Sequence, residues 1–148
     1  MYLEFEILKA VFPKVVGLDD HQMAFHSIAV TGDALQPKGL FLPILENEGD
    51  LLHAINHGAI AAVWDEFIPI PAYTPNYFPL FLTKQLFADI EKLLSLYKEK
   101  VLQEEDVKEM SILVDVELLK EKISTYDNSK KLTQIIQIME ELAVARRG

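Results

Sequence analysis

Short apolar runs bounded by turn-forming residues recur through the first 83 residues. Four of them, 25–30, 40–45, 60–64 and 78–82, have the length and the β-branched or aromatic content of strands. Pro43 lies inside the second run and has no backbone N–H to donate. We therefore expect a sheet-edge position or a bulge at this proline.

Other apolar positions follow helical spacing. Residues 86–101 carry apolar side chains on one face, which predicts an amphipathic helix. Residues 50–57 form a shorter predicted helix, with Asp50 as the N-cap and Gly58 at the C-terminal end. The stretch 2–12 mixes strand-like and helical spacing, and we predict a helix that stops at the proline that follows.

The last third of the chain has a different pattern. No proline follows Pro79, and apolar residues recur at helical spacing over 114–124 and 130–146, which predicts two helices. We therefore divide the chain in two: 1–100 is an α/β domain with a small mixed or parallel sheet and flanking helices, and 101–148 is an all-helical extension.

Composition narrows the class of protein. The chain has 148 residues, 50% of them hydrophobic, which suits a globular domain. Its formal net charge of −9 argues against nucleic-acid binding, because cations supply most of that affinity. Cysteine is absent, which excludes disulfides, thiolate nucleophiles and cysteine metal sites. No apolar run is long enough to span a membrane, and Glu4 and Glu6 are untypical of a signal peptide, so we expect a cytoplasmic protein.

The six glycines are scattered along the chain. They form neither the dinucleotide-binding fingerprint nor the phosphate-binding loop that ends in Gly-Lys-Ser/Thr. The backbone therefore lacks both standard ways of wrapping a polyphosphate. We expect no cofactor.

Two runs in the middle of the chain carry a family resemblance. LQPKGLFL at 35–42 and LLHAINHGAIAAV at 51–63 resemble the patterns V-x-P-G-x-L-F-V-A and F-I-x-x-A-I-x-x-G-A-x-A-V-V of the N-terminal domain of Mur ligases. Those ligases add amino acids or dipeptides to a UDP-linked muramyl peptide. The resemblance covers about residues 25–98 and implies the α/β fold of that domain.

The same comparison shows departures from the family. Thr31, Gly32 and Asp33 stand where the family has Asp-Ser-Arg, whose Ser and Arg help to hold the nucleotide, so an anion replaces a cation. Residues 46–48 (Glu-Asn-Glu) replace an Asp-Gly-His or Asp-Gly-Arg. The ATP-binding and C-terminal ligase domains have no counterpart in the chain, so we expect no ligase activity.

The departures leave a weak ligand-binding candidate. Thr31, Gly32, Asp33 and Lys38 lie in the loop that meets the nucleotide in the family, and Lys38 supplies a cation for a phosphate. The resemblance implies a UDP-sugar or another small nucleotide as the ligand. An ordinary polar turn is the alternative.

Two histidine pairs are further candidates. His53 and His57 share a helix face, as two zinc ligands would, but Ala54 stands where such motifs place Glu. We predict an exposed helix face and no metal. His21 and His26 lie near two aspartates at 19–20, which suggests an acid–histidine pair for proton transfer or, as the simpler alternative, a solvated loop.

Two apolar features bear on partners. Trp64, Tyr73, Tyr77 and Phe78 surround a proline-rich loop and would form a protein-binding surface if exposed, although we favour burial. The apolar stripe of the tail helices either packs on the α/β body or mediates self-association or partner binding.

These observations predict a non-catalytic binding or regulatory module in a bacterial cytoplasm, with a link to peptidoglycan precursor metabolism that the resemblance alone implies. One alternative is a weak UDP-sugar or nucleotide binder. Another is one part of a split ligase that a second chain completes.

Overall fold

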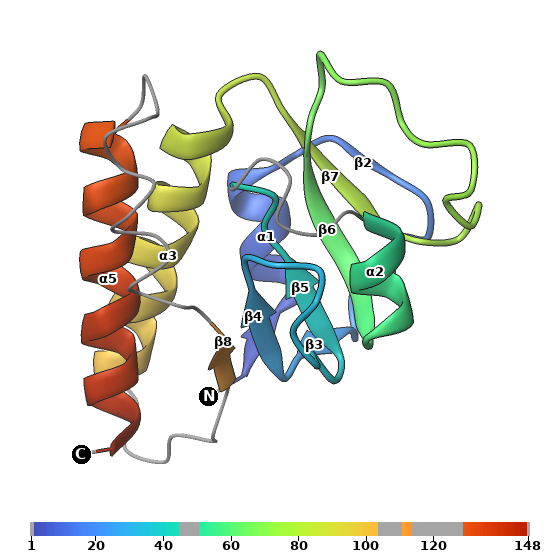
Figure 1. The fold of residues 1–148 in the computed structure, drawn as a ribbon. Helices are drawn as coiled ribbons and strands as arrows, with labels where there is room; N and C mark the ends of the chain where they lie inside the picture. The colour runs from blue at the N-terminus through green and yellow to red at the C-terminus, as the bar shows by residue number, and fades with distance from the viewer. Residues whose placement is uncertain (1, 45–50, 104–110, 114–128, 148) are drawn as a thin grey trace.

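The computed structural model describes residues 2–44, 51–103, 111–113 and 129–147 (Figure 1). Within them the chain forms an α/β fold with a mixed sheet, flanking helices and a C-terminal helix, as the sequence predicted. In chain order the elements are β1 (Leu3–Glu4), α1 (Phe5–Val11), β2 (Val15–Val16), β3 (Ala24–Phe25), β4 (Ser27–Ala29), β5 (Gly39–Phe41), α2 (Leu51–Asn56), β6 (Ala59–Asp65), β7 (Leu80–Thr83), α3 (Leu86–Gln103), β8 (Ser111–Leu113) and α5 (Ser129–Arg147).

The main sheet has six strands in the order β2-β7-β6-β5-β4-β8. β2 runs antiparallel to β7, and the other neighbours are parallel. β1 and β3 form a separate antiparallel pair. Parallel neighbours need crossover connections, which are usually helical. The connection from β6 to β7, residues 66–79, is an irregular proline-rich segment instead, and we call it the crossover.

Successive strand residues point to opposite faces of the sheet, and each face has its own core. In β6, Ala61 and Val63 belong to one core, whereas Ala62 and Trp64 belong to the other. In β7, Phe81 and Leu80 divide in the same way. We call these the first face and the second face.

The first face is covered by α1, α3 and α5. Phe5 and Phe12, at the two ends of α1, have their rings 5.1 and 6.2 Å from the ring of Phe81 in the sheet. α5 lies along α3 (Figure 1) and completes this layer. The core of the first face contains 24 buried residues of the described chain.

The second face has a thinner cover. α2 has only six residues, and the crossover runs beside it (Figure 1). The core here contains seven buried residues of the described chain. Phe41, Ala62, Leu80 and Val16 are successive register partners and form a row across four strands. Val16, Trp64 and Leu82 stay partly exposed at the edge of this core.

The start of α3 follows from the residues between it and β7. The Thr83 hydroxyl accepts a hydrogen bond from the backbone N–H of Gln85 at 3.0 Å and donates one to the Asp89 carboxylate. These bonds satisfy groups that a helix N-terminus otherwise leaves unpaired. The predicted helix at 86–101 is confirmed, and the one predicted at 130–146 is confirmed as α5.

Two sequence-based expectations differ from the structure. β5 is an interior strand that ends at Phe41, so Pro43 lies beyond it and needs neither an edge nor a bulge; the register shift is at Gly39 and Leu40. The tail is not entirely helical, because β8 pairs in parallel with β4. Three apolar residues give no periodicity, so only pairing identifies this strand.

The apolar stripe of α5 is used within the chain. Its residues Ile135, Ile136, Met139 and Leu142 are buried in the core of the first face. The tail therefore packs on the α/β body. The predicted helix at 114–124 and the predicted N-cap Asp50 lie outside the described residues.

Over the part of the chain that the structure describes, no helix is both long and apolar enough to cross a membrane.

Candidate functional site

The loop at 31–39 is tied to its surroundings by backbone and amide groups. Gln36 is buried, and its Nε2 donates to the carbonyl oxygens of Thr31 and Ala34 at 3.0 and 3.1 Å. Its backbone N–H donates to the His57 carbonyl at 2.9 Å, which joins the loop to the end of α2. The side chain of Ser27 donates to the Pro37 carbonyl at 2.9 Å. The loop is therefore a fixed turn.

The four predicted ligand-binding residues have different surroundings in the structure. Asp33 Oδ1 lies 3.1 Å from His53 Nδ1 on α2, so this carboxylate already has a partner. Gly32 is buried, and the Thr31 carbonyl is used by Gln36. Lys38 is exposed, has a positive φ of 46°, and has no ion-pair partner among the described residues.

His53 on α2 and His57, which follows its last residue, have different hydrogen-bond partners. His53 Nδ1 faces Asp33, whereas His57 Nδ1 is 2.7 Å from the His53 carbonyl oxygen and closes the last turn of the helix. Among the described residues, no group of three or more His, Asp or Glu side chains is placed to hold a metal ion.

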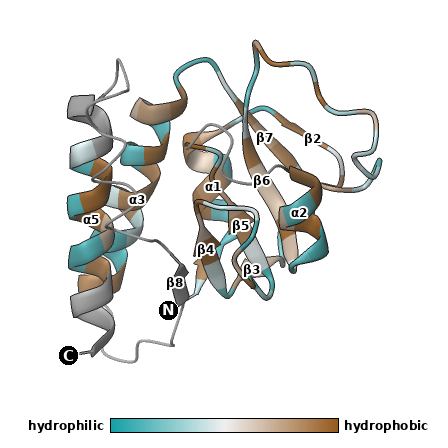
Figure 2. Ribbon diagram, viewed as in Figure 1, coloured by the Kyte–Doolittle hydropathy of each residue, from teal (hydrophilic) through white to brown (hydrophobic). Residues whose placement is uncertain are grey.

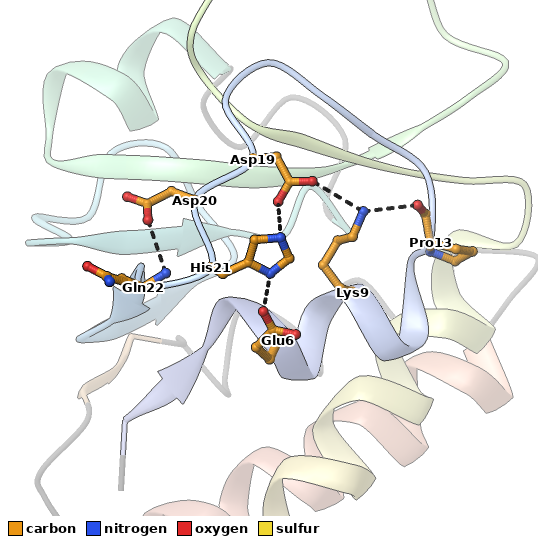
Figure 3. Close-up of polar contacts among 7 residues, drawn as sticks. All are labelled: Glu6, Lys9, Pro13, Asp19, Asp20, His21 and Gln22. Carbon is orange, nitrogen blue, oxygen red and sulfur yellow. Dashed lines mark hydrogen bonds and ion pairs between the residues drawn. The ribbon is translucent and has the colours of Figure 1, made fainter.

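The predicted acid–histidine pair forms, but with a partner that the sequence did not suggest (Figure 3). His21 Nε2 lies 3.1 Å from Asp19 Oδ1, and His21 Nδ1 makes a short hydrogen bond to Glu6 on α1. Lys9, one turn after Glu6, approaches Asp19 Oδ2 at 3.7 Å. Asp20 turns away and accepts the backbone N–H of Gln22. His26 takes no part, because it stacks on Tyr2.

Both ring nitrogens of His21 face carboxylates, and this decides what the cluster does. The hydrogen bond to Glu6, followed by the charges of Glu6 and Asp19, raises the pKa of His21 above its ordinary value. A general base needs a free ring nitrogen within reach of its substrate. With both ring nitrogens engaged by carboxylates, His21 instead links α1 to the loop that follows β2.

The crossover is the part of the described chain with the largest exposed apolar side chains. Phe67 is 74% exposed and Tyr77 is 71% exposed. We call the full set the crossover surface: Leu18, Phe67, Ile68, Ile70, Tyr73 and Tyr77, all at least 43% exposed. Figure 2 shows the brown segments of this loop at the outer edge of the molecule, beyond β6 and β7.

Specific bonds hold the crossover in place at its start. Trp64 Nε1 donates to the Ile68 carbonyl at 3.0 Å, and the Asp65 carboxylate accepts the Phe67 N–H at 2.9 Å. Lys14 Nζ lies 2.7 Å from Glu66 Oε1, and their hydrogen bond lowers the pKa of the Glu66 carboxyl below its ordinary value.

The end of the crossover is held by backbone bonds. The N–H of Thr74 donates to the Pro71 carbonyl, and the N–H of Phe78 donates to the Pro75 carbonyl. The N–H of Leu18 donates to the Tyr77 carbonyl at 3.0 Å. The exposed apolar residues therefore stand on an ordered segment.

The prediction that the aromatic residues around the proline-rich loop are buried is correct for only part of that set. Phe78 is buried at 5% exposure and Trp64 is partly buried, whereas Tyr73 and Tyr77 are exposed. Sequence reasoning missed Phe67 and its neighbours. A usable signal was present, since 66–79 joins two parallel strands and has four prolines instead of a helical pattern.

No model of a known protein family matches this chain, and a search among curated proteins finds no match either.

Proposed function

We propose that this chain is a non-catalytic binding module that docks a protein partner on the crossover surface. The observation that carries the proposal is a set of large apolar side chains exposed on one ordered, proline-rich segment. Single exposed apolar residues are normal, but a group of them on one segment is typical of an interaction site. Aromatic side chains are also the residues that contribute most at interfaces.

The free energy of burying apolar side chains favours docking of a partner on the crossover surface. Full burial of one large apolar side chain contributes roughly 1.5–3 kcal/mol. Phe67 and Tyr77 together therefore supply several kcal/mol on contact with a partner. Because hydrogen bonds and the Lys14–Glu66 ion pair hold the segment in place, ordering it on binding costs less than ordering a free loop.

The rest of the molecule supports binding more than catalysis. His21 has both ring nitrogens engaged, and the Asp33 carboxylate is paired with His53. A link to peptidoglycan precursors, a place in the cytoplasm and a role as one part of a split ligase remain predictions from the sequence.

Lys38 favours a second candidate function, the binding of a UDP-sugar or a small nucleotide. Its exposed ammonium has no ion-pair partner among the described residues, and it lies on a loop that Gln36 holds rigid. The pairing of Asp33 with His53 offsets part of the repulsion that this carboxylate would exert on a phosphate.

Site-specific photo-crosslinking tests the docking proposal. A photoreactive phenylalanine analogue replaces Phe67 or Tyr77 in the full chain, and the protein is irradiated in a lysate of its own cells. The matched control places the same analogue at Leu102, which is 66% exposed on α3. We expect one adduct of defined mass from both crossover positions and none from Leu102. The same adducts from all three positions contradict the proposal.

Calorimetric titration with UDP and with UDP-N-acetylmuramoyl peptides tests the second candidate, with the fluorescence of Trp64 as an independent signal. We expect saturable heat that Lys38→Ala abolishes. A signal that Lys38→Ala leaves unchanged contradicts binding at this loop.

A further inference from the structure

We propose that Glu6, His21 and Asp19 form a pH-sensitive switch, which fixes the end of the crossover while both ring nitrogens of His21 are protonated and loosens it when one of these protons leaves. The switch acts through the loop that follows β2, residues 17–23, which contacts both α1 and the crossover. This inference rests on the proposed function only where it extends to docking, because that loop and the end of the crossover carry part of the crossover surface.

The number of protons in the cluster decides which of its contacts can form. His21 Nδ1 makes its hydrogen bond to Glu6, and His21 Nε2 lies 3.1 Å from Asp19 Oδ1 (Figure 3). An ionised carboxylate only accepts hydrogen bonds, and a neutral imidazole has a single N–H. With both carboxylates ionised, the two contacts are both hydrogen bonds only when the ring is an imidazolium. After the ring loses a proton, a nitrogen lone pair faces a carboxylate, and one of the two contacts breaks.

The charged groups around His21 favour the imidazolium. The hydrogen bond to Glu6, followed by the charges of Glu6 and Asp19, raises the pKa of His21, whereas partial desolvation and the charge of Lys9 oppose this shift. Lys9 Nζ lies 3.7 Å from Asp19 Oδ2, so its charge is partly engaged by that carboxylate. Asp20 turns away from the ring and accepts a backbone N–H.

The raised pKa of His21 sets the sign of the pH dependence. The folded chain takes up this proton more readily than the unfolded chain does. The contribution of the cluster is therefore complete below the ordinary pKa of histidine, about 6.5, and is lost as pH rises through the folded pKa.

The loop that follows β2 connects the cluster to the end of the crossover. The Leu18 N–H donates to the Tyr77 carbonyl at 3.0 Å. At Gly17, where φ is +92°, an added Cβ would lie 2.3 Å from the Phe78 carbonyl oxygen, so the two backbones are in contact. Leu18 and His21 are three positions apart, a span of at most about 11 Å. A movement of His21 relative to α1 therefore disturbs the contact between Leu18 and Tyr77.

The remaining bonds of the loop do not replace the switch. The Phe5 N–H donates to the Met23 carbonyl at 2.9 Å, and the Met23 N–H donates to the Asp20 carbonyl at 3.0 Å. These bonds fix the end of the loop next to β3. Among the described residues, the polar contacts between positions 18–21 and α1 are those of Asp19 and His21.

The two ends of the crossover therefore respond to different ranges of pH. Its start is held by the Lys14–Glu66 ion pair and by the bond from Trp64 to the Ile68 carbonyl, and neither contact involves a histidine. Lys14 lowers the pKa of Glu66, so the start loosens in acid. The end loosens as pH rises through the pKa of His21. The crossover surface is complete between these two ranges.

NMR of the ¹⁵N-labelled full chain from about pH 5.5 to about pH 8.5 tests the switch without a partner. The ring resonances of His21 report its titration, and solvent exchange of the Leu18 amide, corrected for the intrinsic effect of pH, reports the contact with Tyr77. We expect His21 to titrate above its ordinary value. We expect protection of Leu18 to fall roughly two- to fivefold with the same midpoint, as for an exposed ion pair. The Ile68 amide is the internal control and keeps its protection.

Two matched variants test the role of the carboxylate. Glu6→Gln keeps the size of the side chain and removes its charge, so we expect the pKa of His21 to fall toward its ordinary value and Leu18 to lose protection at the acidic end of the range. Glu4→Gln makes the same change at an exposed glutamate whose charge does not act on His21, and we expect no effect. His21→Asn cannot take up a proton, so we expect protection of Leu18 that is independent of pH.

Crosslinking extends the test to docking. The photoreactive analogue at Tyr77 is irradiated in a lysate adjusted to about pH 6 or about pH 8.5, in the otherwise unchanged chain and in the His21→Asn chain. The second chain measures how pH affects the partner and the photochemistry. We expect the yield of the adduct to fall at the higher pH roughly two- to fivefold more in the first chain than in the second.

Titration of His21 at or below its ordinary pKa, or protection of Leu18 that does not follow His21, overturns the switch. Equal effects of Glu6→Gln and Glu4→Gln also overturn it. Crosslinks with the same pH dependence in both chains overturn its link to docking, while the proposed function stands. If the amide results hold and no defined adduct forms at either pH, the docking proposal fails and the switch stands as a property of the loop.

Discussion

The two faces of one sheet differ in how completely they are covered. On the first face, α1, α3 and α5 pack on the strands, and Phe81 lies among the rings of Phe5 and Phe12. On the second face, a six-residue helix and an irregular crossover cover a smaller core. The same strands supply both faces, so the difference comes from the connections. It teaches that the larger buried core lies on one side of this sheet and the exposed apolar side chains of the crossover lie on the other.

We expect the largest loss of stability from a substitution that makes a cavity in the core of the first face. Phe81→Ala removes a fully buried ring, and we expect the free energy of unfolding to fall by about 3–5 kcal/mol in urea denaturation. Phe78→Ala on the second face is the matched change, and we expect a loss of about 3 kcal/mol or less, since its surroundings border solvent and can relax. Equal losses would contradict the comparison.

The next largest loss of stability is expected from a substitution that strains the backbone at the end of α2. Gly58 has a φ of +115°, and an added Cβ would lie 2.7 Å from the Gln36 carbonyl oxygen. We expect Gly58→Ala to destabilise the chain by roughly 2–3 kcal/mol. Lys38→Gly is the counterpart, because Lys38 has a φ of +46° without glycine's freedom. For Lys38→Gly we expect the free energy of unfolding to change by no more than about 1 kcal/mol. A large loss of stability would show that the backbone at Lys38 is unstrained.

Acid should loosen the crossover before it unfolds the first face. The hydrogen bond from Lys14 lowers the pKa of Glu66, so the folded state binds this proton less readily than the unfolded state. The stabilisation is present above the unfolded pKa of the carboxyl and is lost as pH falls through its lower, folded pKa. Hydrogen exchange of the Phe67 and Ile68 amides measures it, and Lys14→Met is the control that should abolish the pH dependence.

The smallest effect should come from the tie between α1 and the loop after β2. The pKa of His21 is raised by Glu6 and then by Asp19, so its contribution is present below about pH 6.5 and is lost as pH rises through the folded pKa. We expect His21→Asn to lower Tm slightly at pH 5.5 and to leave it unchanged at pH 9. A loss at pH 9 as large as that at pH 5.5 would mean that the ring contributes by packing.

Local chemistry explains which features could be predicted. The strand at 60–64 is a short apolar run after Gly58, and its neighbours in sequence are enough to identify it. The Asp19–His21 pair could be predicted for the same reason, since its members lie two positions apart in the sequence. The contact of Glu6 with His21 could not be predicted, because the two residues are 15 positions apart and only the packing of α1 brings them together. Phe67 could not be told from any other loop residue, because only the fold leaves its side chain outside the second core.

By itself, the sequence determined an α/β chain with short apolar strands, an amphipathic helix near residue 90, a turn at 31–33 and an excess of acidic residues before residue 84. These properties depend on neighbours along the chain, which the sequence states directly. Only the tertiary structure decided that β8 joins β4, that α5 covers the first face and that the crossover leaves its apolar side chains in solvent. Those outcomes depend on which distant surfaces meet, and a pattern of apolar positions specifies that a face will be buried without specifying against what.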